Sequence, residues 1–212
     1  RFMSEVEQDT RLTVVDRGNR SVIDTFFEEG LDGTNWHGNI VDICPVGALV
    51  SKDFLHKARA WDLEHTPSIC TSCSQGCNID LHTRDNLVQR LKPRENLDVN
   101  GWWMCDEGRY GFKHVHDERR LTQPQRHDQG EWKFLEWSSL SEELDGTLKQ
   151  ANRLAFVVSP FLTVEEAYLM VSYVRAVQPD ACCVLGQVPL TGEDERFPGG
   201  FTIRAEKCPN RR

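Results

Sequence analysis

Four of the eight cysteines occur at spacings that suit metal binding. Cys70, Cys73 and Cys77 form a C-x2-C-x3-C run, and Cys105 follows well downstream. A [4Fe-4S] cluster needs four thiolates that arrive from different directions, and a loop with three cysteines plus one later cysteine can supply them. The spacing therefore predicts that these four residues hold one [4Fe-4S] cluster.

Structural zinc is the alternative for four cysteines. Such zinc sites usually pair two C-x2-C knuckles, whereas this chain has a C-x2-C-x3-C triple. The apolar residues beside the predicted ligands, Ile69 and 102–104, also suit a partly dry cluster site, although plain core packing explains the aromatic pair equally well. A zinc module that only mediates assembly is kept as the alternative from a different class, and a colourless rather than brown protein would identify it.

Cys44 has a different context, because a cysteine followed by proline closes a ferredoxin-type cluster motif. Its three companion ligands would precede Arg1, and a buried free cysteine is the simpler alternative. Cys182 and Cys183 lie in an apolar run and are expected in the core, while Cys208 lies in a polar tail and receives no role.

Composition narrows the function further. Lys and Arg total 25 against 33 Asp and Glu, which gives a net charge of −8, and the basic residues are scattered, so no nucleic-acid partner is expected. No run of about 18 apolar residues is present, so we expect no direct membrane insertion. Clustered cysteines without an export signal indicate a reducing compartment. The histidines share no spacing with carboxylates, most are expected at the surface, and no catalytic residue is predicted.

Short elements must position the cysteines. We expect a helical start, then strands over 12–15 and 21–27, and short helical stretches on both sides of the Cys44-Pro45 step. The run from Asn78 to Thr83, the polar turn 84–86 and the run from Leu87 to Leu91 predict a β-hairpin. Helical composition follows Cys105 over residues 106–115.

The periodicity changes towards the C-terminus. Residues 123–130 read as a polar linker, and residues 132–137 alternate. Ser139 to Glu142 and Thr163 to Glu166 both resemble capping boxes that open helices, with buried-type strands at 154–158 and 182–185. This β-α-β order predicts the start of a parallel α/β domain.

The expected fold class is therefore α+β iron–sulfur segments followed by the start of an α/β domain. The expected boundaries are 1–65, 66–122 and 123–212. Because Arg1-Phe2 is no natural start and no closing element precedes Arg212, we interpret the chain as an internal fragment.

Several motifs carry a family resemblance. The run Gly-Asn-Ile-Val-Asp-Ile-Cys-Pro-Val-Gly-Ala-Leu at 38–49, the four spaced cysteines, and Cys-Asp-Glu-Gly-Arg at 105–109 are the clearest. With these motifs the chain resembles the large, 75 kDa-type iron–sulfur subunit of respiratory complex I, the bacterial NADH-quinone oxidoreductase, over nearly all of its length.

The resemblance implies the roles of the cysteines. Cys44 would be the last ligand of a [4Fe-4S] cluster whose first three cysteines end just before Arg1, and the four later cysteines would hold an additional cluster found in only some members. The ferredoxin-like remnant would be 1–65, the [4Fe-4S] domain of molybdopterin-oxidoreductase type 66–122, and the start of the α/β molybdopterin-oxidoreductase-like domain 123–212. Full-length members also carry a [2Fe-2S] cluster and one bound by a histidine and three cysteines.

The resemblance also implies an activity. Family members relay electrons from NADH, through a flavin subunit, towards quinone in a proton-translocating complex. The implied partners are the other complex I subunits, including the NADH- and flavin-binding one, and the implied location is peripheral, on the cytoplasmic side of the inner or plasma membrane.

One position distinguishes the two classes of protein that share these motifs, complex I subunits and molybdenum or tungsten enzymes. Molybdenum and tungsten enzymes such as formate dehydrogenase usually have a lysine two residues after the fourth cysteine, where this chain has Glu107. A carboxylate cannot donate the hydrogen bonds of an ammonium. Complex I is thus favoured, with a molybdopterin-dependent formate dehydrogenase subunit as the alternative.

Overall fold

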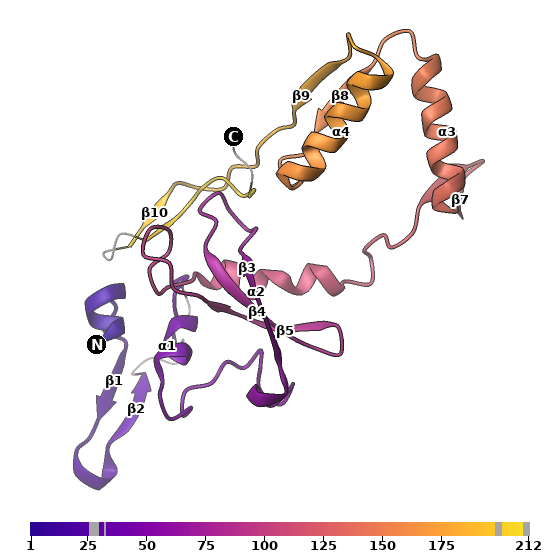
Figure 1. Cartoon of the computed structure of the whole chain (residues 1–212). Helices are drawn as coiled ribbons and strands as arrows, with labels where there is room; N and C mark the ends of the chain where they lie inside the picture. The colour runs from indigo at the N-terminus through magenta and orange to yellow at the C-terminus, as the bar shows by residue number, and fades with distance from the viewer. Residues whose placement is uncertain (26–29, 32, 198–200, 210–212) are drawn as a thin grey trace. The chain divides into compact units, whose positions relative to one another are not determined.

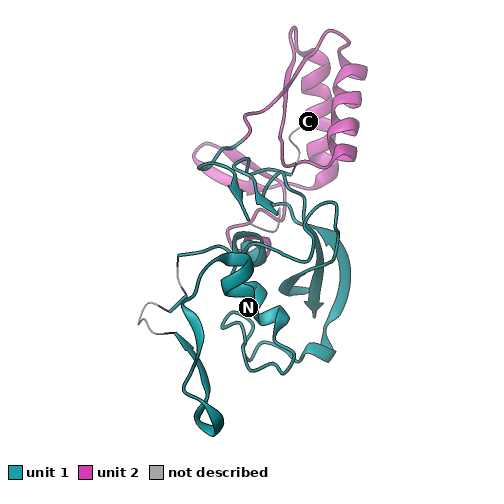
Figure 2. Cartoon of the chain, turned by 90° about the vertical axis from the view of Figure 1, so that its left-hand side faces the viewer, with its two compact units in different colours: residues 1–113, 189–209 teal, residues 114–188, 210–212 magenta. Residues whose placement is uncertain are grey.

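The computed structural model describes residues 1–25, 30–31, 33–197 and 201–209 (Figure 1). The chain divides into two compact units (Figure 2). The first contains residues 1–113 together with 189–209, and the described part of the second contains residues 114–188. The C-terminal segment thus returns to the unit that contains the predicted cluster ligands.

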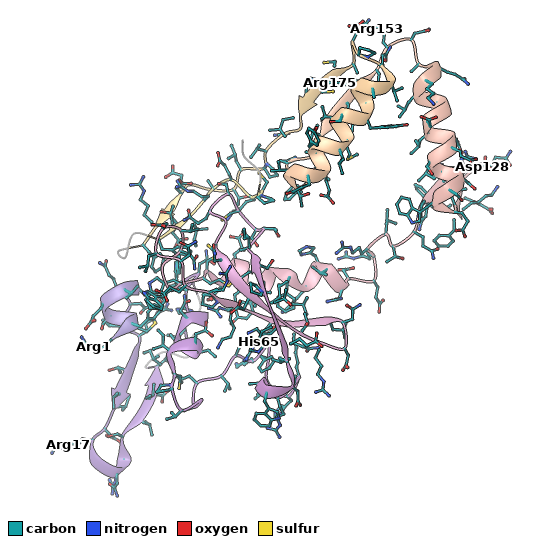
Figure 3. The ribbon with its side chains drawn as sticks, in the orientation of Figure 1. Arg1, Arg17, His65, Asp128, Arg153 and Arg175 are labelled. Atoms are coloured by element: carbon teal, nitrogen blue, oxygen red, sulfur yellow. The ribbon has the colours of Figure 1, made fainter. Side chains whose placement is uncertain are left out.

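The first unit begins with one short helix and a hairpin. A π-helical turn, η1 (Phe2–Glu7), precedes antiparallel β1 (Leu12–Val15) and β2 (Val22–Thr25). A 3-10 turn, η2 (Gly18–Arg20), joins the strands, and Figure 3 shows Arg17 at this tip. The predicted helical start and both strands are confirmed over the described residues, and Phe26 and Phe27 of the second predicted strand lie outside them.

Helix α1 (Gly38–Ile43) delivers Cys44 at its C-terminal end. The Cys44 N–H still donates to the Ile40 carbonyl (3.1 Å), and Pro45 then prevents the helix from continuing. The predicted second helical stretch after Pro45 is wrong. A tight turn stands there instead, with Gly47 in the left-handed region (φ 63°), which glycine adopts without a Cβ clash.

A three-stranded antiparallel sheet forms the centre of the first unit. Its strands are β3 (Glu64–Ile69), β4 (Asn78–Arg84) and β5 (Leu87–Pro93), in that order, after the 3-10 turn η3 (Ala60–Asp62). Asp85 and Asn86 both have positive φ, which matches the tight turns that join twisted strands. The predicted hairpin is confirmed.

Two further segments complete the first unit. Helix α2 (Asp106–Tyr110) follows Cys105 and continues as the 3-10 helix η4 (Gly111–His116), which confirms the predicted helix. Near the C-terminus, β10 (Glu195–Arg196) pairs with β11 (Thr202–Ile203). Phe201 and Ile203 are buried in the same core as the cysteines, so the C-terminal segment contributes to the walls of the site.

The second unit has a hairpin and a β-α-β segment. Strands β6 (Gln125–Asp128) and β7 (Glu131–Phe134) are antiparallel, whereas β8 (Ala155–Val158) and β9 (Cys182–Leu185) are parallel. The helices are α3 (Trp137–Gln150) and α4 (Val164–Val177). The parallel pair confirms the predicted β-α-β order. The predicted linker at 123–130 is wrong over residues 125–128, which form the first strand of the hairpin.

Two local predictions in this unit have opposite outcomes. The capping box of α4 is confirmed, because Thr163 Oγ1 accepts from Glu166 N–H and the Glu166 carboxylate accepts from Thr163 N–H. The capping box at Ser139 is wrong, since α3 begins two residues earlier after Glu136. Ser139 is already inside the helix, where the Glu142 N–H that it would have capped can pair with the carbonyl four residues before it.

The predicted burial of Cys182 and Cys183 is also wrong, since Cys182 is exposed and Cys183 is half-buried. Their strand belongs to a sheet of two strands in the described part of the chain, and α4 packs mainly against the other strand, β8. An apolar strand without a covering layer leaves its side chains accessible.

Candidate metal centre

The cysteine run forms the loop between β3 and β4. Ile69 pairs with Asn78 at the ends of the two strands, so residues 70–77 must turn back sharply. The Cys70 N–H donates to the Cys77 carbonyl (2.8 Å), which closes the loop. The strand pair thereby brings the first and last cysteines of the run together.

Cys105 lies close to the β3–β4 loop, although in the sequence it follows the β4–β5 hairpin. It is the N-cap residue of α2, where its Sγ accepts a hydrogen bond from Gly108 N–H (3.3 Å). A Cβ at Gly108 would stand 3.0 Å from Cys70 Sγ and 3.4 Å from Cys105 Sγ. Only glycine therefore lets α2 approach both sulfurs without displacing them.

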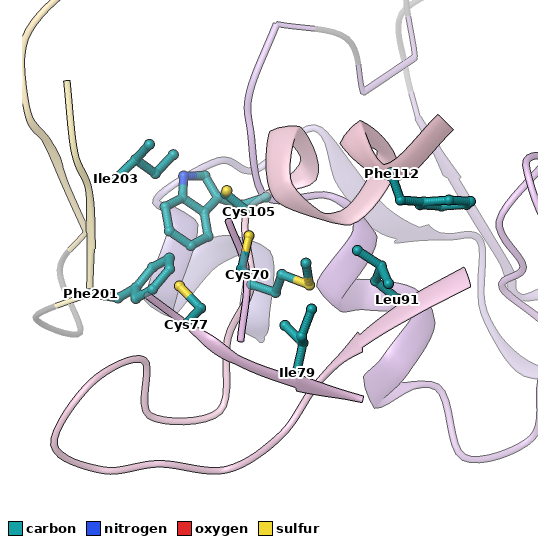
Figure 4. Packing of buried hydrophobic residues seen from close by; sticks show 10 residues of the cluster. Cys70, Cys77, Ile79, Leu91, Cys105, Phe112, Phe201 and Ile203 are labelled. Carbon is teal, nitrogen blue, oxygen red and sulfur yellow. The ribbon is translucent and has the colours of Figure 1, made fainter. Parts of the chain in front are cut away.

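All four predicted ligands are buried. Their exposed fractions are 6% for Cys70, 6% for Cys73, 4% for Cys77 and 5% for Cys105. Figure 4 shows three of them in one packed interior with Phe201 and Ile203. The structure thus brings the four predicted residues together in an environment with little water.

Burial opposes ionisation of these thiols. It is the main cause that raises the pKa of Cys70 and of Cys77, and it raises the pKa of Cys105 to about 12. Charges on the neighbouring cysteines raise these pKa values further. Four thiolates packed this closely need cations among them, which the irons of a cluster would supply.

The donor set itself favours a cluster over zinc. Its four buried thiols come from one C-x2-C-x3-C loop and one later cysteine, and a cubane can take each of them on a different iron. Structural zinc usually takes two C-x2-C knuckles instead. The donor set therefore fits a [4Fe-4S] cluster better than a single zinc ion.

A buried amide ties α1 to the segment before Cys105. Asn39 is 1% exposed, and its Nδ2 donates to the carbonyls of Trp36 (3.0 Å) and Met104 (2.9 Å). Its Oδ1 accepts from Met104 N–H (3.1 Å) and from Arg109 Nη2 (3.1 Å). Every hydrogen-bonding position of this amide is used, so Asn39 fixes how the Cys44 helix meets the Cys105 segment.

Arg109 extends this connection. It is 6% exposed, and its Nη1 lies 2.7 Å from the Asp42 carboxylate on α1. Asp106 accepts from Gly38 N–H (2.8 Å), and burial raises the pKa of its carboxyl. A side chain on Gly38 would collide with Arg109 and Asp106, so the absence of a Cβ permits this close packing.

The C-terminal segment covers the cysteine loop. Ser74 N–H donates to the Glu206 carbonyl (3.0 Å), and Ser74 Oγ donates to the Glu206 carboxylate (2.9 Å). Lys207 Nζ lies 2.7 Å from Glu107 Oε2. Glu107 is thus paired with an ammonium from a distant part of the sequence. Cys208, which received no role, is fully buried beside this contact.

Cys44 lies in a separate apolar cavity of about 600 Å³. Phe2 and Met3 line this cavity together with Ile40 and Ile43 of α1. The Leu49 N–H donates to Cys44 Sγ (3.5 Å), and this and the neighbouring backbone amides lower the pKa of the thiol. A thiol that backbone N–H groups favour as thiolate, in an apolar cavity, suits a metal ligand.

Sequence reasoning missed several residues of this region. Asn39 and Arg109 lie inside the motifs at 38–49 and 105–109 but received no role, and Lys207 lies in no motif. Their burial and partners reveal what they do. Most histidines were expected at the surface, and His82 is an exception, since it is 4% exposed and stacks on His65. Of the apolar residues beside the predicted ligands, Met104 is buried, but Ile69 and Trp102 are more than half exposed. The structure therefore does not support the prediction that Ile69 and Trp102 exclude water from the cysteines.

Comparison with known proteins agrees with this geometry. Residues 1–50 match the ferredoxin-like domain of NADH-quinone oxidoreductase subunit 3, and residues 63–117 match the molybdopterin oxidoreductase Fe4S4 domain. The fold and the buried cysteines thus define an iron–sulfur protein whose second matched domain is of the [4Fe-4S] type.

The relatives identify the family. The chain is 34% identical to subunit 3 of the NADH-quinone oxidoreductase of Thermus thermophilus over 84% of its length, and 34% identical to the corresponding NADH-quinone oxidoreductase subunit of Streptomyces coelicolor over 82%. It is 33% identical to the NADH-ubiquinone oxidoreductase 75 kDa subunit of Reclinomonas americana over 80%. The chain belongs to this 75 kDa-type subunit family of NADH-quinone oxidoreductase, as its motifs predicted, and the formate dehydrogenase alternative is not favoured.

The match covers only part of each relative. The chain spans 21% of the Streptomyces protein, 23% of the Thermus protein and 25% of the Reclinomonas protein. Within the described residues, no helix combines the length and the apolar composition needed to cross a bilayer.

Proposed function

We propose that this chain carries electrons one at a time within an NADH-quinone oxidoreductase, through a [4Fe-4S] cluster held by Cys70, Cys73, Cys77 and Cys105. The observation that carries this proposal is the convergence of four buried thiols from one loop and one later cysteine. When bound, the cluster supplies the redox chemistry, while the protein supplies ligands, a low dielectric and fixed placement.

Each part of the site has a role in this proposal. The β3–β4 loop holds three ligands, and α2 presents the fourth while Gly108 keeps the space between the sulfurs open. The C-terminal segment excludes water from the loop through Ser74 and Glu206. Burial of this kind influences the reduction potential of a cluster.

Cys44 is proposed as a ligand of a second [4Fe-4S] cluster, completed by cysteines outside this sequence. The support is the apolar cavity in which Phe2 and Met3, at the very start of the sequence, face the Cys44 loop. Ligands placed just before Arg1 would reach the same cavity. The domain division at 65 and 122 is proposed together with this arrangement. The first matched segment, 1–50, ends before residue 65, and nearly all of the second, 63–117, lies between the two boundaries.

The proposed partners are the other subunits of the complex, including the NADH- and flavin-binding subunit. The proposed activity of the whole complex is NADH:quinone oxidoreduction coupled to proton translocation, and a [2Fe-2S] cluster is expected in the full-length protein. The proposed location is peripheral, on the cytoplasmic side of the inner or plasma membrane. The support is the names of the relatives, which are subunits of NADH-quinone oxidoreductases.

The test is electron paramagnetic resonance of the anaerobically purified complex, reduced in steps. One reducible signal should disappear in Cys105→Ser and persist in Cys182→Ser, whose exposed thiol lies in the second unit. A signal set that is identical in both variants would contradict the assignment. Stoichiometric molybdopterin in a chain extended to its natural C-terminus would instead support a formate dehydrogenase.

A further inference from the structure

A second kind of metal-binding residue set lies away from the cysteines. Glu7, Asp9 and His37 each offer one ligand atom, and these atoms lie within 4.8 Å of one another. Glu7 comes from the end of η1, Asp9 follows it, and His37 immediately precedes α1. This is the one set of its kind among the described residues.

Thr34 adds a fourth oxygen to the set. Its Oγ1 lies 2.8 Å from His37 Nε2 and donates a short hydrogen bond to Glu7 Oε1. Glu7 Oε1 also lies 3.2 Å from His37 Nε2. A carboxylate, an imidazole and a hydroxyl therefore already converge on one point.

The Glu7 side chain is the second, independent sign of a ligand. It is only 2% exposed, and its Oε2 is buried without a hydrogen-bond partner. A buried carboxylate oxygen without a partner is costly, because nothing replaces the water that it loses. Asp9 differs, since Arg11 donates to it through both its backbone N–H and its guanidinium (2.8 Å each). The carboxylate oxygen of this set that lacks a hydrogen-bond partner is thus Oε2 of Glu7.

There is room for a cation with bound water. A cavity of about 470 Å³ lies against Glu7 and Thr34 and is also lined by Glu195. Glu195 accepts from Trp36 Nε1 (3.4 Å), so a further carboxylate faces this space. A metal bound by three or four protein ligands could complete its coordination with water from this cavity.

We propose that Glu7, Asp9 and His37, with Thr34, bind one divalent transition-metal ion of the Mn²⁺ type. An imidazole among the ligands disfavours Ca²⁺ and Mg²⁺, which take oxygen ligands, whereas carboxylates and water suit Mn²⁺. The absence of cysteine from the set disfavours the softest ions. The site is separate from the cluster ligands and does not depend on the proposed role in electron transfer.

The position of this site suggests what the ion does. It would join the end of η1 to the start of α1, and these two helices line the cavity at Cys44 from both sides. A bound ion would therefore hold two walls of that cavity at a fixed separation. This structural role needs no change in the oxidation state of the ion.

The test is a titration of the full chain, purified anaerobically with its clusters, with MnCl₂, followed by the sharp resonance of free Mn²⁺. We expect one Mn²⁺ per chain, and at least tenfold weaker binding in Glu7→Gln and in His37→Gln. Glu5→Gln is the matched control, because Glu5 lies on the same helix with its side chain 57% exposed. Cys44→Ser should also bind normally, which separates this site from the cysteines.

A second measurement keeps the proposal testable if the variants do not fold. Pulsed resonance of Mn²⁺ bound to the unmodified chain should reveal coupling to one imidazole nitrogen, as expected for His37. Absence of stoichiometric binding, absence of this coupling, or equal affinity in Glu5→Gln and Glu7→Gln would each overturn the proposal.

Discussion

Replacement of Asn39 by alanine tests how the fold holds Cys105 in place. The change removes four hydrogen bonds and leaves the Met104 N–H, the Met104 carbonyl and one Arg109 N–H without their partner. The Trp36 carbonyl keeps the backbone N–H of residue 39 as a donor. Each buried group left unsatisfied costs about 1–3 kcal/mol, and partial relaxation with water entry reduces the sum. We therefore expect a loss of about 3–5 kcal/mol in the stability of the first unit.

Iron release to a colorimetric chelator is the appropriate assay, because loss of a cluster makes equilibrium unfolding irreversible. If opening is fast and reversible, the rate of release follows the population of the open state, and 3 kcal/mol raises that population by roughly 150-fold. Asn19→Ala is the control, since Asn19 is exposed in the β1–β2 turn. A release rate for Asn39→Ala within threefold of this control would refute the reasoning.

Three further predictions concern single residues. Gly108→Ala should lower the iron content, because the new Cβ presses on the sulfurs of Cys70 and Cys105. Gly146→Ala is the control, because open space surrounds that position. It should keep its full iron content and stabilise α3 by up to about 1 kcal/mol. Burial, with Arg90 nearby, lowers the pKa of His82 from 6.5 to about 4, so the folded state resists protonation and should lose about 2 kcal/mol of stability between pH 8 and pH 5. Iron release should therefore speed up more between these pH values in the unmodified chain than in His82→Gln. Thr163→Ala should destabilise α4 by about 1 kcal/mol in thermal unfolding without changing iron content.

Much of the local structure could be predicted because short-range rules decide it. The β4–β5 hairpin follows from two apolar runs around a polar turn, and the α4 cap follows from Thr163 and Glu166. The prediction of a capping box at Ser139 was wrong because the same residue types can occur inside a helix that starts earlier. Periodicity identified the elements well and their first residues less well.

The surroundings of the cysteines could not be predicted in the same way. The four proposed ligands were predicted from spacing alone, but the pairing of Glu107 with Lys207 joins residues far apart in the sequence. The burial of Asn39 and Cys208 likewise depends on segments that return from elsewhere in the chain. Such contacts are tertiary, and no local pattern encodes them.

The most direct test of the central claim is the metal content of the anaerobically purified chain. Iron, acid-labile sulfide and zinc should be determined together, for the unmodified chain and for Cys105→Ser. We predict about four irons and four sulfides per chain with no stoichiometric zinc, and loss of both in the variant, because one complete ligand set is present. One zinc per chain in place of iron would contradict the cluster at Cys70, Cys73, Cys77 and Cys105, and about eight irons would contradict the view that Cys44 depends on ligands outside this sequence.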